Sequence, residues 1–365
     1  MWKKYGISVL LTLLLGSATG AHAGEFGDLY RAYQQAVAAD KKEEVAAAAK
    51  TVYDYVSQAL PEDNKNRAAI TLNYGKALIQ VKEYDLAERA LQESLELYHA
   101  AYGEEAVEQV DPLMALAEAR AKNQFHDHRM RYRIYVDQAL EVAAALQGEE
   151  TFLYATLAQE GGRIGLDEAG HLGAKKYLDK AHDLFSGPFQ KYLMQSIMAN
   201  VYLGKYHLIR KQYPEAEPYL LEAVAIADQH SEKDTQIELT ARAFLVELYS
   251  ERGDSDKSIA QCQAIGKATP FDMEQDPAPL FKRKLKYPPD ALRSGSEGYA
   301  VVRYTLSREG LAENAEILEV NGHRHFGDAA LEYVSSMRFA PRFENGEPVA
   351  TEGRRLRAKF KMASE

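Results

Sequence analysis

Few of the side chains that carry out chemistry in proteins form a recognisable site in this sequence. His126 and His128 would suggest a metal, but residues two apart point to different sides of a helix, and no second pair at ligand spacing lies nearby. The glycines of residues 161–165 follow no predicted strand and lack the Lys-Ser/Thr of a phosphate loop. The sequence has no G-x-S-x-G or H-E-x-x-H motif. We therefore expect a protein that is not an enzyme and needs no metal or other cofactor.

Basic side chains alternate with apolar ones along the last predicted strand, which suits binding better than catalysis. The basic residues are Arg355, Arg357, Lys359 and Lys361, and the apolar ones are Leu356, Ala358, Phe360 and Met362. A period of two places the basic set outward and the apolar set inward. Two interpretations stay open. The charges block pairing with strands of other copies, or they favour an extended acidic partner that adds a strand to this edge.

Small residues recur at fixed offsets through the middle of the chain. Copies that begin at Gly75, Gly162, Gly204 and Val246 share offsets of 0, 3, 12, 16 and 19, and the last three begin 42 residues apart. These offsets resemble those of the tetratricopeptide repeat, in which small residues let paired antiparallel helices pack closely. The period exceeds the usual 34 residues, which predicts longer helices. With weaker copies near residues 33 and 120, we expect five to six helical pairs over residues 26–266.

A helical array of this kind presents its first helices to a peptide or protein partner. The repeat offsets place six residues on that surface: Asn73, Lys76, Gln80, Arg163, Tyr202 and Lys205. Lys76, Arg163 and Lys205 occupy one equivalent position, where they would receive acidic groups of a peptide. Ordinary solvated helix surface is the alternative and favoured interpretation, because isolated charge rows are usually solvated.

The elements that must position the basic strand form a small module. Residues 299–306 alternate apolar and polar side chains, as in a half-buried strand. Gly310 predicts a turn into a second strand at residues 315–320, and Asp328 is placed to cap a helix that carries Ala330 and Val334. The predicted order is ββαβ. With the helical repeats before it, the whole chain is expected to be of α+β class.

Length and charge divide the chain in the same way. A chain of 365 residues is longer than an ordinary domain with a single hydrophobic core, so two domains are expected. Residues 281–365 hold 15 Lys and Arg and 12 Asp and Glu, a net charge of +3. Because the whole chain has a net charge of −10, residues 1–280 carry a net charge of −13. Nucleic-acid binding needs a basic surface, so this acidic larger part argues against nucleic acid as a partner. A stretch rich in Pro and Asp predicts a linker at 267–280 between a repeat domain at 24–266 and a terminal domain at 281–365.

The N-terminus has the features of an export signal. Lys3 and Lys4 precede an apolar run at residues 7–15, and Ala21-His22-Ala23 fits a cleavage site. This run has nine residues, seven of them apolar, and is too short to span a bilayer. We expect export with cleavage after Ala23. An uncleaved N-terminus that anchors the chain in the inner membrane is the alternative.

The order of short motifs in residues 286–362 resembles that of the C-terminal domain of TonB, the energy transducer of Gram-negative envelopes. The motifs occur in order: Tyr287-Pro288, Glu297-Gly298, Ala329-Ala330-Leu331, Arg338-Phe339-Ala340-Pro341 and Gly346-Glu347-Pro348-Val349. The resemblance implies a periplasmic domain that docks outer-membrane transporters by strand addition at the last strand. It also implies an inner-membrane anchor coupled to the ExbB–ExbD proton-driven motor.

The rest of the chain departs from that family. The first 23 residues contain no Ser followed four residues later by His, and helical repeats replace the long Pro-rich spacer. We therefore expect a periplasmic adaptor of the TonB family that docks transporters through its terminal domain and binds another partner through the repeat groove. The alternative is a scaffold for envelope assembly or peptidoglycan-associated complexes that uses the terminal domain only for docking. The exposed edge is also compatible with a homodimer.

Overall fold

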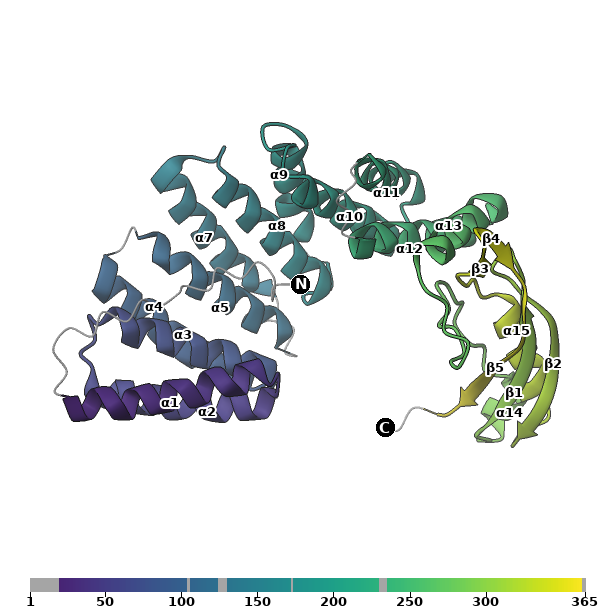
Figure 1. The fold of residues 1–365 in the computed structure, drawn as a ribbon, viewed down its shortest axis with the longest axis horizontal. Coiled ribbons are helices and arrows are strands. Elements are labelled where there is room, and N and C mark those ends of the chain that lie inside the picture. The colour runs from purple at the N-terminus through teal and green to yellow at the C-terminus, as the bar shows by residue number, and fades with distance from the viewer. Residues whose placement is uncertain (1–19, 104–105, 124–129, 172, 230–234, 363–365) are drawn as a thin grey trace. The chain divides into compact units, whose positions relative to one another are not determined.

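The computed structural model describes residues 20–103, 106–123, 130–171, 173–229 and 235–362. Contacts group the chain into two compact units, one ending at Phe189 and one beginning at Gln190. Helices make up the first unit and the start of the second, and a small sheet domain closes the chain (Figure 1). The fold is therefore α+β, as predicted. None of the helices in the described residues is long and apolar enough to cross a membrane. The predicted signal peptide falls almost wholly on residues 1–19, outside the described part.

Helices of the first unit form successive pairs, α1/α2, α3/α4, α5/α7 and α8/α9. Their bounds are α1 Gly20–Ala38, α2 Lys42–Ala59, α3 Lys65–Gln80, α4 Tyr84–Tyr102, α5 Val110–Lys122, α7 Tyr132–Gln147, α8 Phe152–Asp167 and α9 Ala174–Ser186. The second unit adds α10 Leu193–Ile209, α11 Tyr213–Asp228, α12 Thr235–Arg252 and α13 Ser255–Ala268, which pair as α10/α11 and α12/α13. The described residues thus contain six helical pairs, where the sequence predicted five to six.

A glycine in the first helix allows close packing within three of the pairs. A Cβ atom added at Gly75 would lie 2.6 Å from the Leu91 side chain, so only glycine fits without a shift. Gly162 against Leu178 and Gly204 against Leu220 repeat this contact, at 2.4 and 2.5 Å. The α12/α13 pair carries the fully buried Val246 and Cys262 at the equivalent positions. The predicted small residues therefore lie at the helix–helix contacts.

The sheet domain is a three-stranded antiparallel sheet covered on one face by a helix. Its elements are α14 Pro289–Arg293, β1 Gly298–Leu306, β2 Ala312–Asn321, α15 Phe326–Ser335 and β5 Thr351–Phe360, with strand order β2-β1-β5. The inward residues of β1 are buried as the alternation predicted: Ala300, Val302, Tyr304 and Leu306. Phe326 of α15 stacks on Phe360 of β5 at 4.2 Å between ring centroids. The core thus lies between α15 and the sheet.

Three details of this domain differ from the sequence-based predictions. Asp328 lies inside the first turn of α15 and does not cap it, because the helix already begins after His325. Met362, expected to point inward, is 41% exposed because it lies beyond the end of β5. A hairpin of β3 (Arg342–Glu344) and β4 (Glu347–Val349) was not predicted. Its turn is Asn345-Gly346, both with positive φ, a strong hairpin signal that the prediction overlooked.

The sheet domain packs directly on α13. A Cβ atom at Gly266 would lie 2.3 Å from the Pro341 carbonyl oxygen, and one at Gly310 would lie 3.2 Å from the Cβ of Cys262. Cys262 belongs to a buried cluster that includes Phe281, and burial raises the pKa of its thiol to about 12. The lone cysteine is therefore a buried packing residue, in a small cluster that joins the last helical pair to the terminal domain and is separate from the core of the sheet.

Candidate protein-docking site

β5 lies at one edge of the three-stranded sheet. One of its sides pairs with β1 in an antiparallel register that sets Arg355 opposite Arg303, Arg357 opposite Val301 and Lys359 opposite Tyr299. Its other side pairs with no strand among the described residues. A strand edge of this kind presents backbone N–H and C=O groups that another extended chain can pair with.

The direction of the outward backbone groups follows from one hydrogen bond. The N–H of Arg355 donates to Oδ1 of Asp276 at 3.0 Å, on the side away from β1. Successive residues of an antiparallel strand alternate between pairing with one neighbour and facing the other side. The register is unbroken from Arg354 to Phe360, so the N–H groups of Arg357 and Lys359 also face the open edge.

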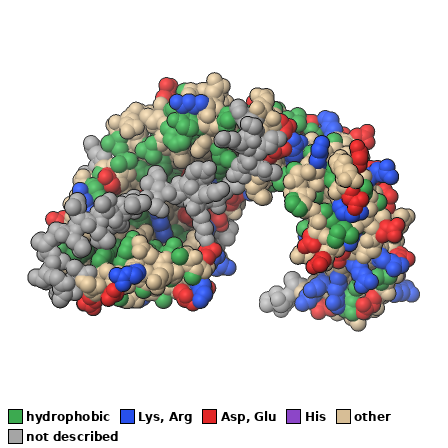
Figure 2. Space-filling model, in the orientation of Figure 1, with side chains coloured by type: hydrophobic (Ala, Val, Ile, Leu, Met, Phe, Trp, Pro, Cys, Tyr) green, Lys and Arg blue, Asp and Glu red, His purple; other side chains and the backbone are tan. Residues whose placement is uncertain are grey.

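The basic side chains line the same edge. Arg355, Arg357 and Lys359 are exposed, as is Lys361 just beyond the strand, whereas Ala358 and the other inward residues contribute to the core. Lys and Arg side chains gather where β5 ends (Figure 2). The predicted alternation is thus present in the fold. It combines unpaired backbone groups with a row of positive charge.

The outer face of the sheet holds part of this row in place. The guanidinium of Arg357 lies 3.5 Å from the ring centroid of Tyr299, a cation–π contact. The Tyr299 hydroxyl donates to Glu319 of β2 at 2.5 Å, and this hydrogen bond raises the pKa of the phenol. Arg303 of β1 pairs with Glu316 of β2. Glu316 and Glu319 of β2 are therefore engaged by the central strand, and the positive charge remains at the β5 edge.

The six helical candidates divide between the two units. Asn73, Lys76 and Gln80 lie on α3 and Arg163 on α8, in the first unit, whereas Tyr202 and Lys205 lie on α10, in the second. Gln80 is exposed and the other five are half-buried. The structure thus keeps the six on first helices of their pairs, as predicted.

Arg163 is neutralised by its own helix. Its guanidinium donates to both carboxylate oxygens of Glu160, at 2.5 and 2.9 Å, and lies 3.7 Å from Asp167. These partners occupy the preceding and following turns of α8. Because two carboxylates already compensate its positive charge, Arg163 would attract an acidic peptide only weakly.

Three residues that contribute to the site were not predicted from the sequence. Asp276 and Arg354 connect the predicted linker to β5, and Tyr299 orients Arg357. An acidic linker beside a basic strand was a signal for the first contact, although sequence alone does not place the two side by side. Within the described residues no group of three or more His, Cys, Asp and Glu is arranged to hold a metal ion, and His126 and His128 lie outside them.

Comparison with known proteins supports the terminal part of this assignment. Residues 283–362 match the family model of the Gram-negative bacterial TonB protein C-terminal. No curated protein matched the chain. The matched residues contain α14, β1, β2, α15 and the whole of β5. The sheet domain with the open, basic edge is therefore a TonB-like C-terminal domain.

Proposed function

We propose that this chain is a periplasmic adaptor that docks outer-membrane transporters through the open edge of β5 and binds a second protein through its helical pairs. The family match at residues 283–362 supports a role in envelope energy transduction and protein partners in general. Coupling to a proton-driven motor is not part of this proposal. The proposed activity is binding, without catalysis or a cofactor.

The observation that carries the proposal is the coincidence of open backbone and positive charge on β5. Arg357 and Lys359 turn their N–H groups to the edge and expose their side chains on the outer face. An extended segment that adds a strand gains affinity from the backbone hydrogen bonds and specificity from alternate side chains. Acidic residues on the outer face of that segment would meet the basic row.

The helical pairs supply the second binding region. The repeated Gly–Leu contacts of α3/α4, α8/α9 and α10/α11 support tetratricopeptide-type packing. Such arrays bind peptides and proteins along their first helices. Asn73, Lys76 and Gln80 on α3 are the proposed contacts in the first unit, and Tyr202 and Lys205 on α10 are those in the second. Arg163 is not proposed as a contact, because Glu160 and Asp167 already bind its guanidinium.

In-cell photocrosslinking tests which edge of the sheet is used. A photoreactive residue at position 359 should crosslink to outer-membrane transporters, and one at position 313 on β2 should not, since both positions are exposed but only the first lies on the basic edge. Equal crosslinking from both positions would contradict docking at β5. Crosslinks from position 359 to cell-wall or assembly proteins alone would favour the scaffold alternative.

The periplasmic location has its own test. Mass spectrometry of the purified cellular protein should find a mature chain that begins at Gly24, in the periplasmic fraction. Retention of residues 1–23 in the membrane fraction would contradict export and would favour the anchored alternative.

A further inference from the structure

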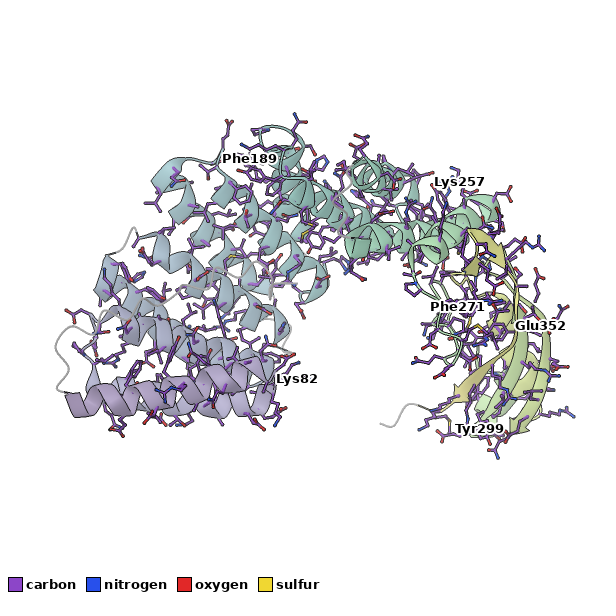
Figure 3. The ribbon with its side chains drawn as sticks, viewed as in Figure 1. Lys82, Phe189, Lys257, Phe271, Tyr299 and Glu352 are labelled. Atoms are coloured by element: carbon purple, nitrogen blue, oxygen red, sulfur yellow. The ribbon has the colours of Figure 1, made fainter. Side chains whose placement is uncertain are left out.

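The segment between α13 and α14 is attached to the beginning of β5. The Arg354 guanidinium donates to the carbonyl oxygen of Met273 at 3.2 Å and to that of Gln275 at 3.1 Å. It also lies over the ring of Phe271, 6.0 Å from its centroid. Figure 3 labels Phe271 beside the sheet domain, and Figure 1 shows the chain running along this domain before α14. The predicted linker is thus fixed to the domain that it precedes.

One contact of this segment occupies a docking position. The Asp276 carboxylate accepts the outward N–H of Arg355, the hydrogen bond that a carbonyl oxygen of an added strand would otherwise accept. The pairing with β1 is interrupted next to this point, between Tyr304 and Leu306. Arg355 is therefore the first regular position of the edge, and it is already engaged from within the chain.

We propose that residues 271–276 form an internal strap that competes with an incoming strand for the β5 edge. The strap has the chemistry expected of the partner, with carbonyl oxygens on Arg354 and a carboxylate beside the basic row. With the strap in place, a partner pairs only with Arg357 and the residues after it. Full engagement requires release of Asp276. This inference rests on the proposed docking at β5 and adds its regulation.

Hydrogen exchange of the full-length protein tests the strap without any ligand. In an Asp276→Ala variant the amide of Arg355 loses its acceptor and should exchange about tenfold faster, while the Arg357 amide keeps its rate. Glu274→Ala is the matched control, since Glu274 carries the same charge and its side chain makes no hydrogen bond or ion pair to the described residues of β5. Unchanged exchange at Arg355 in Asp276→Ala would overturn the strap.

Peptide affinity tests the competition. The probe is a fluorescent ten-residue peptide of alternating Glu and Val, with a Lys–Val peptide as the control for charge. Removal of Asp276 should tighten the Kd for the Glu–Val peptide about fivefold, the equivalent of one hydrogen bond. Glu274→Ala should leave that Kd unchanged. Equal affinity of the wild type and Asp276→Ala, with NMR shifts at Arg357 and Lys359, would overturn the competition.

The two proposals fail in different ways. If neither the wild type nor Asp276→Ala binds the Glu–Val peptide, docking at β5 is wrong, and so is the proposed competition for this edge. Faster exchange at Arg355 would then still establish the Asp276 contact as a structural one. If the wild type and Asp276→Ala both bind the peptide away from β5, the NMR shifts will fall on other elements, and the competition is overturned.

Discussion

The basic row of β5 and the equivalent basic position of α3, α8 and α10 place positive side chains in different surroundings. On β5 the charges lie beside backbone N–H groups that face an open edge, as at Arg357 and Lys359. On α8 the backbone is satisfied within the helix, and Arg163 is bound by Glu160 and Asp167. The strand offers a partner both hydrogen bonds and charge. Arg163 on α8 offers a charge that its neighbours already compensate.

This difference shows that a repeated charge indicates a binding site only when its surroundings leave it free. Exposed ion pairs on helices contribute little to stability and are easily formed between successive turns. An edge strand has no such local partner for its backbone. The predictions below test this contrast between strand and helix.

The largest effect is expected from Phe360→Asp. Phe360 is 1% exposed and stacks on Phe326, so a carboxylate there would be buried without a partner and should cost about 4 kcal/mol or more. Because the sheet domain packs directly on α13, its unfolding should expose the thiol of Cys262 and make it reactive as well. Thiol labelling and urea unfolding measure both, and Phe360→Leu is the control.

The helices of the first unit should withstand this substitution. Only α10 to α13 belong to the same unit as the sheet domain. Loss of helical signal from the second unit alone is the expected result. Complete loss of helix on Phe360→Asp would show that the entire chain unfolds as one.

A smaller effect is expected from Glu217→Gln on α11. Burial alone would raise the pKa of Glu217, but hydrogen bonds from Lys257, Tyr249 and Arg252 outweigh it and hold the pKa below its ordinary value. The carboxylate therefore stabilises the fold at pH values above its unfolded pKa. That contribution disappears as the pH falls through the lower folded value.

Urea unfolding at two pH values measures this contribution. At pH 7 the Glu217→Gln protein should be about 2 kcal/mol less stable than the wild type. At pH 3, below the ordinary pKa of a glutamate, the difference should shrink, because the carboxylate of the unfolded wild-type chain then binds a proton and unfolding becomes more favourable. A difference that stays constant between the two pH values would show that the substitution acts through packing.

The smallest effect is expected from Arg163→Gln. Since its charge is compensated within α8, the affinity of the full chain for the Glu–Val peptide should change by less than about twofold. The free energy of unfolding should fall by about 0.5 kcal/mol. A loss of binding tenfold or greater, by fluorescence anisotropy, would make Arg163 a partner contact and would reverse the contrast with β5.

Much of the fold was predictable because the relevant patterns are local. Small residues at helix contacts, such as Gly204 against Leu220, and the alternation of Ala300 to Leu306 both follow from short-range periodicity. The order of turns carried the resemblance to the TonB C-terminal domain. The Asn345-Gly346 hairpin carried an equally local signal and could have been predicted.

The remaining features depend on contacts between distant segments. Asp276 and Arg355 are far apart in sequence, and no periodicity relates them. The packing of Gly266 on Pro341 likewise joins a helix to a loop after α15. The ion pairs of Arg163 are a local feature, because Glu160 and Asp167 lie three and four residues away on the same helix, and they could have been predicted. Long-range packing thus limited the prediction of the site more than that of the fold.

The most direct test of docking at β5 is a double charge reversal, Arg357→Glu with Lys359→Glu, in the full-length protein. Both side chains are exposed, so the fold should be retained, as circular dichroism would verify. The Kd for the Glu–Val peptide should weaken tenfold or more, about 1.4 kcal/mol, and the Lys–Val peptide should now bind better than it binds the wild type. Unchanged affinity for both peptides would contradict recognition of acidic extended segments at this edge.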